Sequence, residues 1–447
     1  MPRRPQPRIL DRARRRVILI YLLSAVIGVI AGLGAVVFRW MISLNKAVFF
    51  DLLGSGLTNL TGSRYVLLVL PALGGLIVGP LTEMVAPETR GHGVPEVMEA
   101  VMLKGGRIRK RVALAKIVAS SITIGSGGSA GREGPIAQIG AASASAIGQV
   151  FKLSRDNLRL LVTCGLAAGI AGTFNAPLGG ALFGLEVLMR GVSAFNAIPV
   201  IFSSVIGATT ASIFLGRHPA FRVVGLSYWD PREIPLYILL GLAFGLLAVA
   251  WVRLFYGFEE FFRKLSVPGY LKPALGGLGA GVLMVLFAGY GVGGVGYEGI
   301  DKALSGSIPL RLLLLLGVAK MLSTSLTIGS GGSGGVFAPS LYIGGMFGLS
   351  LGLVYQGLFP GLVRQPATYA LAGMASLFAG AAQAPMTVIV MVPEMSEDYS
   401  LIAPFMASAS MSYLVAWLLL RGSSIYTLKL ERRGVRVRQP GVPQLIR

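Results

Sequence analysis

Charged residues are scarce in this chain, and so are the residue types that metal sites and enzymes need. Asp, Glu, Lys and Arg make up 13% of the 447 residues, whereas soluble domains carry about 25%. Cys164 is the only cysteine, so the chain cannot form a disulfide within itself. The two histidines do not cluster with carboxylates at metal-ligand spacing, and no nucleophile is placed beside a base. The sequence therefore predicts no metal and no cofactor, and an intramembrane enzyme is only a remote alternative.

The composition is that of a membrane protein. Hydrophobic residues make up 54% of the chain, and the mean hydropathy is +0.72. Apolar runs of spanning length recur, for example at Val17–Phe38, Leu236–Val252 and Leu401–Leu420. Other runs are short or interrupted by Gly and Pro, which is typical of helices that end inside the bilayer. We therefore expect an all-α polytopic membrane protein whose helices are in part broken and only partly spanning.

The net charge of +21 would suit a nucleic-acid-binding protein, but its distribution favours a membrane protein. Residues 1–16 and 421–447 each carry a net charge of +6, and Lys104–Arg111 adds five positive charges. Short basic segments beside apolar runs mark cytoplasmic ends and loops. We therefore expect no nucleic-acid partner, a basic cytoplasmic tail at 1–16 and another at 431–447. An even number of crossings follows, in a multi-pass protein of a bacterial inner membrane.

The chain contains one unit twice. Ala115–Pro135 and Ala319–Pro339 are identical at 12 of 21 positions, with a constant offset of 204 residues. Pro71–Leu76 recurs as Pro273–Leu278. The sequence therefore predicts two transmembrane repeats, 17–215 and 216–430. The residues alone do not decide whether the repeats are parallel or inverted, but in transporters the site lies where the repeats meet.

Each repeated core ends in Gly and Ser residues, followed by a proline that we expect to open a helix, Pro135 or Pro339. The first amides of a helix have no intrahelical partner, and the helix dipole makes that end positive. Glycines let an anion approach these amides closely. The alternative is that the small residues only allow close helix packing. The recurrence of the same Gly-Ser pattern in both halves favours an anion site.

Glu133 is the conspicuous residue of the first motif, because its equivalent in the second repeat is Phe337. A carboxylate at membrane depth is a functional candidate. Being an anion itself, it can occupy the anion site in place of the transported ion, and protonation would release it. Glu133 is therefore predicted to be both gate and proton acceptor. The alternative is a structural pair with Arg132 or a surface position.

Together these motifs resemble those of the CLC chloride channels and chloride/proton exchangers. The resemblance spans roughly residues 17–430 and is carried by Gly91–Pro95, Gly131–Pro135, Phe174–Leu178, Gly335–Pro339 and Tyr426. It implies a CLC-type fold with two inverted-topology repeats, and a homodimer with one pore in each subunit. It also implies chloride and other small anions, protons, lipid and a second copy of the chain as partners.

The resemblance also implies which residues form the site. The gating carboxylate falls on Glu133, and the central site on the Val336 and Phe337 amides with the Tyr426 hydroxyl. The full set of expected anion-binding residues is His92, Gly93, Gly131, Arg132, Gly134, Gly335, Val336, Phe337, Ala338 and Tyr426.

Two positions depart from the family pattern. His92 stands where relatives have a serine, so either its imidazole binds the anion or the ring points away and leaves a backbone amide. Val187 stands where exchangers often have a glutamate that forms an inner proton station, and Glu186 is its neighbour.

We therefore expect chloride transport, with proton-coupled exchange slightly favoured because Glu133 is intact. A passive chloride channel is the alternative that Val187 favours, and a fluoride-selective relative is a remote one. The tail 431–447 is too short for the paired nucleotide-sensing domains of some relatives.

Overall fold

The computed structural model describes residues 7–189, 193–221 and 230–435. The predicted tail residues 1–6 and 436–447 lie outside this part of the chain. Within it, the regular elements are all helical, apart from two isolated backbone bridges. A helix satisfies its own backbone hydrogen bonds, which lipid requires of any spanning segment. The expectation of an all-α membrane protein is confirmed.

Among the residues that the structure describes, the first half of the chain forms nine α-helices, and the second half forms nine more. In the first half they are α1 (Pro7–Lys46), α2 (Ser55–Thr61), α3 (Leu70–Pro80), α4 (Val94–Leu103), α5 (Arg111–Gly125), α6 (Glu133–Val150), α7 (Arg155–Phe174), α8 (Pro177–Phe183) and α9 (Ala194–Leu215). In the second half they are α10 (Ile234–Lys264), α11 (Lys272–Leu286), α12 (Tyr297–Leu304), α13 (Leu310–Gly329), α14 (Phe337–Leu358), α15 (Ala367–Ala382), α16 (Pro385–Ser396), α17 (Ile402–Leu419) and α18 (Thr427–Arg432). Helix α1 begins at Pro7, inside the segment predicted to be a tail.

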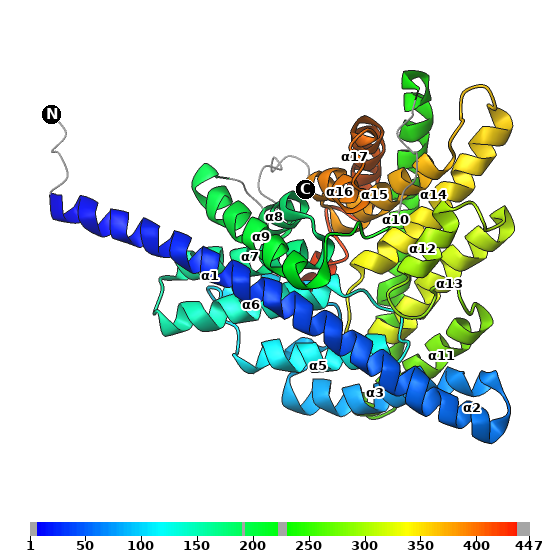
Figure 1. Ribbon diagram of the computed structural model, residues 1–447, viewed down its shortest axis with the longest axis horizontal. Coiled ribbons are helices and arrows are strands. Elements are labelled where there is room, and N and C mark those ends of the chain that lie inside the picture. The colour runs from blue at the N-terminus through cyan, green and yellow to red at the C-terminus, as the bar shows by residue number, and fades with distance from the viewer. Residues whose placement is uncertain (1–6, 190–192, 222–229, 436–447) are drawn as a thin grey trace.

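Among the described residues, nine helical segments are long and apolar enough to cross a membrane. Others are too short, since a bilayer core needs about 20 helical residues. Helices α4, α8 and α12 have 10, 7 and 8 residues, and α16 has 12. The protein is therefore an integral multi-pass membrane protein in which partly spanning helices stand beside full ones. Figure 1 shows α1 running along one side of the molecule, with α3 and α11 side by side at one end.

Helices of the two halves begin and end at equivalent positions. Helix α5 ends at Gly125 and α13 at Gly329, while α6 begins at Glu133 and α14 at Phe337. Both helix starts lie two residues before the prolines that were predicted to open them. Both prolines thus lie in the first turn of a helix, as predicted, because their missing N–H has no acceptor there.

Reciprocal hydrogen bonds join equivalent residues of the two halves at the centre of the molecule. Gly131 N–H donates to Gly335 O at 2.7 Å, and Gly335 N–H donates to Gly131 O at 2.6 Å. The hydroxyls of Ser129 and Thr324 lie 2.9 Å apart, and their equivalents Ser333 and Ser120 lie 2.8 Å apart. Such pairs are produced by a local two-fold axis. The segments on this axis, 123–142 and 327–346, are buried throughout except at Arg132.

Candidate functional site

Two helix N-termini meet at this axis. The first backbone bond of α6 runs from Ile136 N–H to Arg132 O at 3.1 Å, and that of α14 from Ser340 N–H to Val336 O at 3.0 Å. The amides ahead of these bonds, at 132–134 and 336–338, have no acceptor within their own helix. The two positive helix ends therefore present backbone donors to one buried space, which is the requirement for an anion site.

The Glu133 carboxylate occupies this space. Its side chain belongs to a residue that is 2% exposed. Its Oε2 accepts a hydrogen bond from the Ala338 amide at 3.3 Å, and its Oε1 accepts one from the Tyr297 hydroxyl at 3.1 Å. The sequence had left open a surface position or a pair with Arg132, but the carboxylate is buried and bonds to the helix start of the other repeat. The Glu133 carboxylate thus lies where the backbone amides predicted to bind an anion come together.

His92 lies on a loop between two glycines in left-handed conformations, Gly91 at φ 80° and Gly93 at φ 84°. Its ring centroid is 5.7 Å from that of Tyr426 and 5.7 Å from that of Phe255. Both ring nitrogens are buried, and neither has a hydrogen-bond partner among the described residues. Buried polar atoms nearly always have one. The imidazole therefore lies against Tyr426 with hydrogen-bonding capacity that an anion or a water can use.

Glycine is required where α6 meets this loop. A Cβ added at Gly134 would lie 2.1 Å from His92 O and 3.1 Å from Gly335 Cα. A Cβ at Gly93 would lie 2.8 Å from Gly134 O. Real Cβ atoms do not approach backbone this closely, so these glycines hold three segments in backbone contact. Close packing, one of the two roles considered for the glycine motif, is therefore observed at these positions, and anion binding stays a prediction.

Aromatic rings line the space beside Tyr426. Phe337 contacts Phe378 at a centroid distance of 4.4 Å, and Tyr426 lies 6.4 Å from Phe378 and 6.1 Å from Phe183. The sequence pointed to Phe337 and Tyr426 but not to Phe183 or Phe378. Single phenylalanines in apolar helices carry no signal of a contact with distant site residues, so only the three-dimensional arrangement reveals that they pack against Tyr426.

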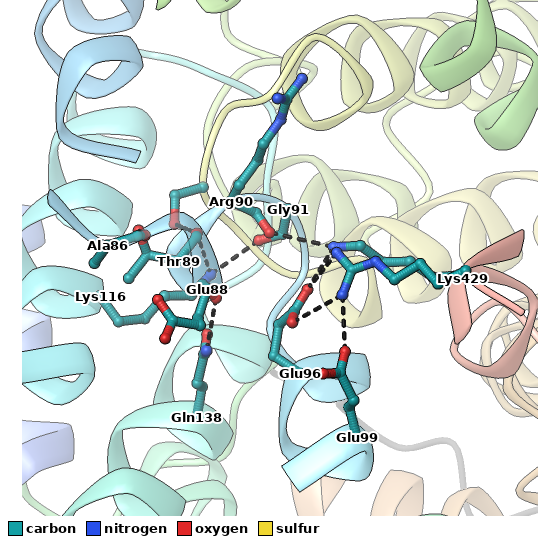
Figure 2. A network of polar contacts seen from close by, with 12 residues as sticks. Ala86, Glu88, Thr89, Arg90, Gly91, Glu96, Glu99, Lys116, Gln138 and Lys429 are labelled. Carbon is teal, nitrogen blue, oxygen red and sulfur yellow. Dashed lines mark hydrogen bonds and ion pairs between the residues drawn. The ribbon is translucent and has the colours of Figure 1, made fainter. Parts of the chain in front are cut away.

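A buried lysine supports the His92 loop, as Figure 2 shows. Lys116 is fully buried, and its Nζ donates to Thr89 O and Gly91 O, each at 2.9 Å. Lys429 Nζ lies 3.0 Å from Glu96 Oε1 and donates to Arg90 O at 3.3 Å. The carbonyl groups of Thr89, Arg90 and Gly91 therefore hold the loop in place through the two lysines.

Lys320 is the equivalent of Lys116 in the second repeat. Neither lysine was predicted from the sequence to be part of the site. Lys320 is fully buried, and its Nζ donates to Gly291 O at 2.9 Å and to Gly294 O at 3.0 Å. A signal was available in the sequence, because a lysine inside an apolar helix at the same position of both repeats is costly unless it has partners.

Glu186 and Val187, the candidates for an inner proton path, both have contacts within the protein in this structure. The Glu186 carboxylate accepts hydrogen bonds from the amides of Met386 and Thr387, at 3.1 and 2.8 Å, and so caps the start of α16. Its repeat equivalent Glu394 caps α8 in the same way, through Gly179 N–H at 2.6 Å. Val187 is 5% exposed and packs in the apolar core. Protonation of Glu186 would weaken the hydrogen bonds by which it caps α16.

Comparison with known proteins identifies the family. The family model described as "Voltage gated chloride channel" matches residues 74–417. The chain belongs to the voltage-gated chloride channel, or CLC, family. The H(+)/Cl(-) exchange transporter ClcA of Yersinia pestis bv. Antiqua (strain Angola) is 34% identical over 429 residues, which cover 93% of this chain and 88% of that protein.

Other CLC proteins resemble the chain over most of its length. Chloride channel protein CLC-f of Arabidopsis thaliana is 32% identical over 386 residues, and the match covers 80% of this chain but only 48% of that longer protein. The crystal structure of a slow cyanobacterial Cl-/H+ antiporter superposes with a TM-score of 0.83 at 26% identity, covering 93% of this chain and 97% of that one. The family and CLC-type fold expected from the motifs are confirmed, and the roles of the individual site residues stay predictions.

Proposed function

We propose that this CLC protein transports chloride across a membrane in exchange for protons, with Glu133 as the gate. The observation that carries the proposal is that the Glu133 carboxylate accepts a hydrogen bond from the Ala338 amide at the start of α14. The ionised Glu133 carboxylate has the same charge as chloride, and it lies at a helix start, where an anion is favoured. Relatives named as H(+)/Cl(-) exchangers support the same assignment.

The arrangement suggests how one site serves both ions. Amides and hydroxyls at helix ends bind an anion without a full positive charge, so the anion can also leave. While ionised, Glu133 competes with chloride for these donors. When protonated, it no longer needs them, and chloride can take its place. The central site then uses the Val336 and Phe337 amides with the Tyr426 hydroxyl, beside His92, as the family resemblance implied.

A passive chloride channel is the second candidate, and two observations favour it. Val187 replaces the usual inner carboxylate, and Glu186 is engaged in capping α16. Exchange then needs water to carry protons from the inner face to Glu133 by another route. We retain exchange as the first proposal because Glu133 is intact.

The arrangement in the membrane is also a proposal. Two inverted repeats, 17–215 and 216–430, fit the reciprocal Gly131–Gly335 hydrogen bonds at the centre of the molecule. The basic ends of the chain favour cytoplasmic termini in a bacterial inner membrane. The family resemblance supports a homodimer with one pore per subunit.

The class of activity is tested with purified protein in chloride-loaded liposomes. Dilution into chloride-poor medium in the presence of a potassium ionophore should give chloride efflux well above that of empty liposomes. Efflux equal to that of empty liposomes, from protein that elutes as a folded species, would exclude anion transport.

Removal of the Tyr426 hydroxyl should weaken chloride binding. Tyr426→Phe keeps the ring that contacts His92 and Phe378 but removes one donor, which should raise the dissociation constant about fivefold to tenfold. Isothermal titration with chloride measures this. Tyr237→Phe is the control, since it removes a buried hydroxyl that bonds Thr368 between α10 and α15. Equal affinities for wild type and Tyr426→Phe would show that Tyr426 is not a ligand.

Substitution of His92 should change anion selectivity. His92→Ser replaces an unpartnered imidazole with a small hydroxyl donor, so the ratio of chloride to nitrate flux should change. The ratio is compared from about pH 5 to pH 8, so that the result does not depend on one pH. The same ratio in both proteins throughout this range would support binding by the loop backbone alone.

A further inference from the structure

The loop ahead of α12 is built like the loop that carries His92. Gly294 and Gly296 have φ values of 61° and 103°, as Gly91 and Gly93 have 80° and 84°. A helix follows at once in each case, α12 at Tyr297 and α4 at Val94. In both loops one residue separates the glycines, and that residue is His92 in the first and Val295 in the second. The second repeat therefore has its own version of the anion-site loop.

The same contacts fix both loops. Lys116 Nζ donates to Gly91 O at 2.9 Å, and Lys320 Nζ donates to Gly294 O at 3.0 Å. The same two carbonyls accept a second hydrogen bond from the opposite repeat, Gly91 O from Gly334 N–H at 3.3 Å and Gly294 O from Ala130 N–H at 3.2 Å. A two-fold axis relates these contacts, so the loops lie at opposite ends of the site. The first loop contacts the C-terminal segment through Lys429, whose Nζ donates to Arg90 O at 3.3 Å.

The loops differ in the first residue of the helix that follows. The Val94 side chain has no polar group, whereas the Tyr297 hydroxyl donates a hydrogen bond to Glu133 Oε1 at 3.1 Å. The guanidinium of Arg132 lies over the Tyr297 ring, 5.2 Å from its centroid. Tyr297 also lines a cavity of about 230 Å³ together with Arg39, Arg132 and His218. Tyr297 thus contacts the Glu133 carboxylate and also lines a basic cavity.

We propose that Tyr297 is a positioning residue for the gate, whose hydroxyl holds the Glu133 carboxylate in the anion pathway and so sets the pH at which transport switches on. The proposal rests on the proposed function of Glu133. The amide of Ala338 is 3.3 Å from Oε2, so the phenol provides the shorter of the two hydrogen bonds. A hydrogen bond to an ionised acceptor is stronger than one to a neutral group, so this contact favours the ionised, blocking form.

Other groups near Glu133 act on the same equilibrium and are unchanged when only the phenol oxygen is removed. These are its neighbour Arg132, Lys320 on α13 and Tyr426 ahead of α18. Arg39 on α1 interacts with Arg132 and Tyr297. Tyr297→Phe keeps the ring under Arg132 and removes one donor to the carboxylate. The blocking form then loses stability relative to the protonated form.

The test is the pH dependence of chloride flux in liposomes. Wild-type flux should rise on acidification, and in Tyr297→Phe the half-maximal flux should move to higher pH by about one unit, the effect of losing one charge-assisted hydrogen bond. Tyr342→Phe is the matched control, because it removes a phenol that donates to Tyr290 O at 2.6 Å on the same loop without touching Glu133. Its midpoint should equal that of wild type.

The outcomes separate this proposal from the proposed function. If wild-type protein carries no chloride, the proposed function fails. If wild-type flux responds to pH but Tyr297→Phe has the same midpoint, or Tyr342→Phe shifts as far, Tyr297 does not position the gate. In a Glu133→Gln background Tyr297→Phe should have no effect on the pH profile, since the group it acts on is gone. Should Tyr297→Phe not fold, Tyr297→Met removes the same donor with a flexible apolar side chain, and the same outcomes apply.

Discussion

Replacing Glu133 with glutamine should abolish proton coupling and pH-dependent gating while leaving chloride flux in place. Glutamine keeps the shape of the side chain but removes the negative charge and the site of protonation, so it imitates the protonated gate. Proton movement should fall at least about tenfold, to the level of empty liposomes. Chloride flux should be the same at acidic and neutral pH. Chloride and proton electrodes in the same vessel measure both quantities.

Glu233→Gln is the control for the loss of a buried carboxylate. Glu233 is 4% exposed and accepts a hydrogen bond from the Tyr369 hydroxyl at 2.8 Å, at the start of α10. Coupling and pH dependence should survive in that variant. Normal coupling in Glu133→Gln, with both variants folded, would show that Glu133 is not the gate.

Gly134→Ala should stop anion transport, with a loss of flux of more than about tenfold. In a helix, alanine is intrinsically more stable than glycine by about 1 kcal/mol, so any loss must come from contacts. The added Cβ would meet His92 O at 2.1 Å and Gly335 Cα at 3.1 Å. These are backbone atoms of the site itself, and they can only move by separating the helix ends from the His92 loop. Chloride efflux from liposomes measures the effect.

Gly357→Ala supplies the matched control on α14. No atom lies within 4 Å of a Cβ added there. Its flux should equal that of wild type. A Gly134→Ala protein that transports chloride as fast as Gly357→Ala would mean that the backbone contacts around Gly134 do not shape the site.

The parts of the site that lie within the repeated motifs could be predicted from the sequence. The Gly-Ser stretches, the prolines and the lone Glu133 carry local signals, namely turn chemistry, helix starts and a charge at membrane depth. The structure brings their segments together at Gly131 and Gly335, as the recurrence of the motif had indicated. The prolines indicated the first turn of each helix, but not its first residue, which lies two positions earlier.

The partners of these residues could not be predicted, because they come from distant parts of the chain. Tyr297 lies 164 residues from Glu133, and Glu186 lies 200 residues from the α16 amide that it caps. No local pattern encodes such a contact. Glu186 shows the consequence. From the sequence it was a candidate for an inner proton path, whereas its hydrogen bonds to α16 give it a structural partner.

The account is tested most directly by whether a chloride gradient drives protons uphill. Wild-type protein is reconstituted in liposomes with equal pH on both sides, and the membrane potential is held at zero by potassium and valinomycin. If Glu133 binds protons and competes with chloride for the same site, chloride moving out of the liposomes should drive protons into them, and the external medium should become more alkaline until a proton ionophore is added. Chloride efflux without any change in external pH would contradict exchange and identify the protein as a passive chloride channel.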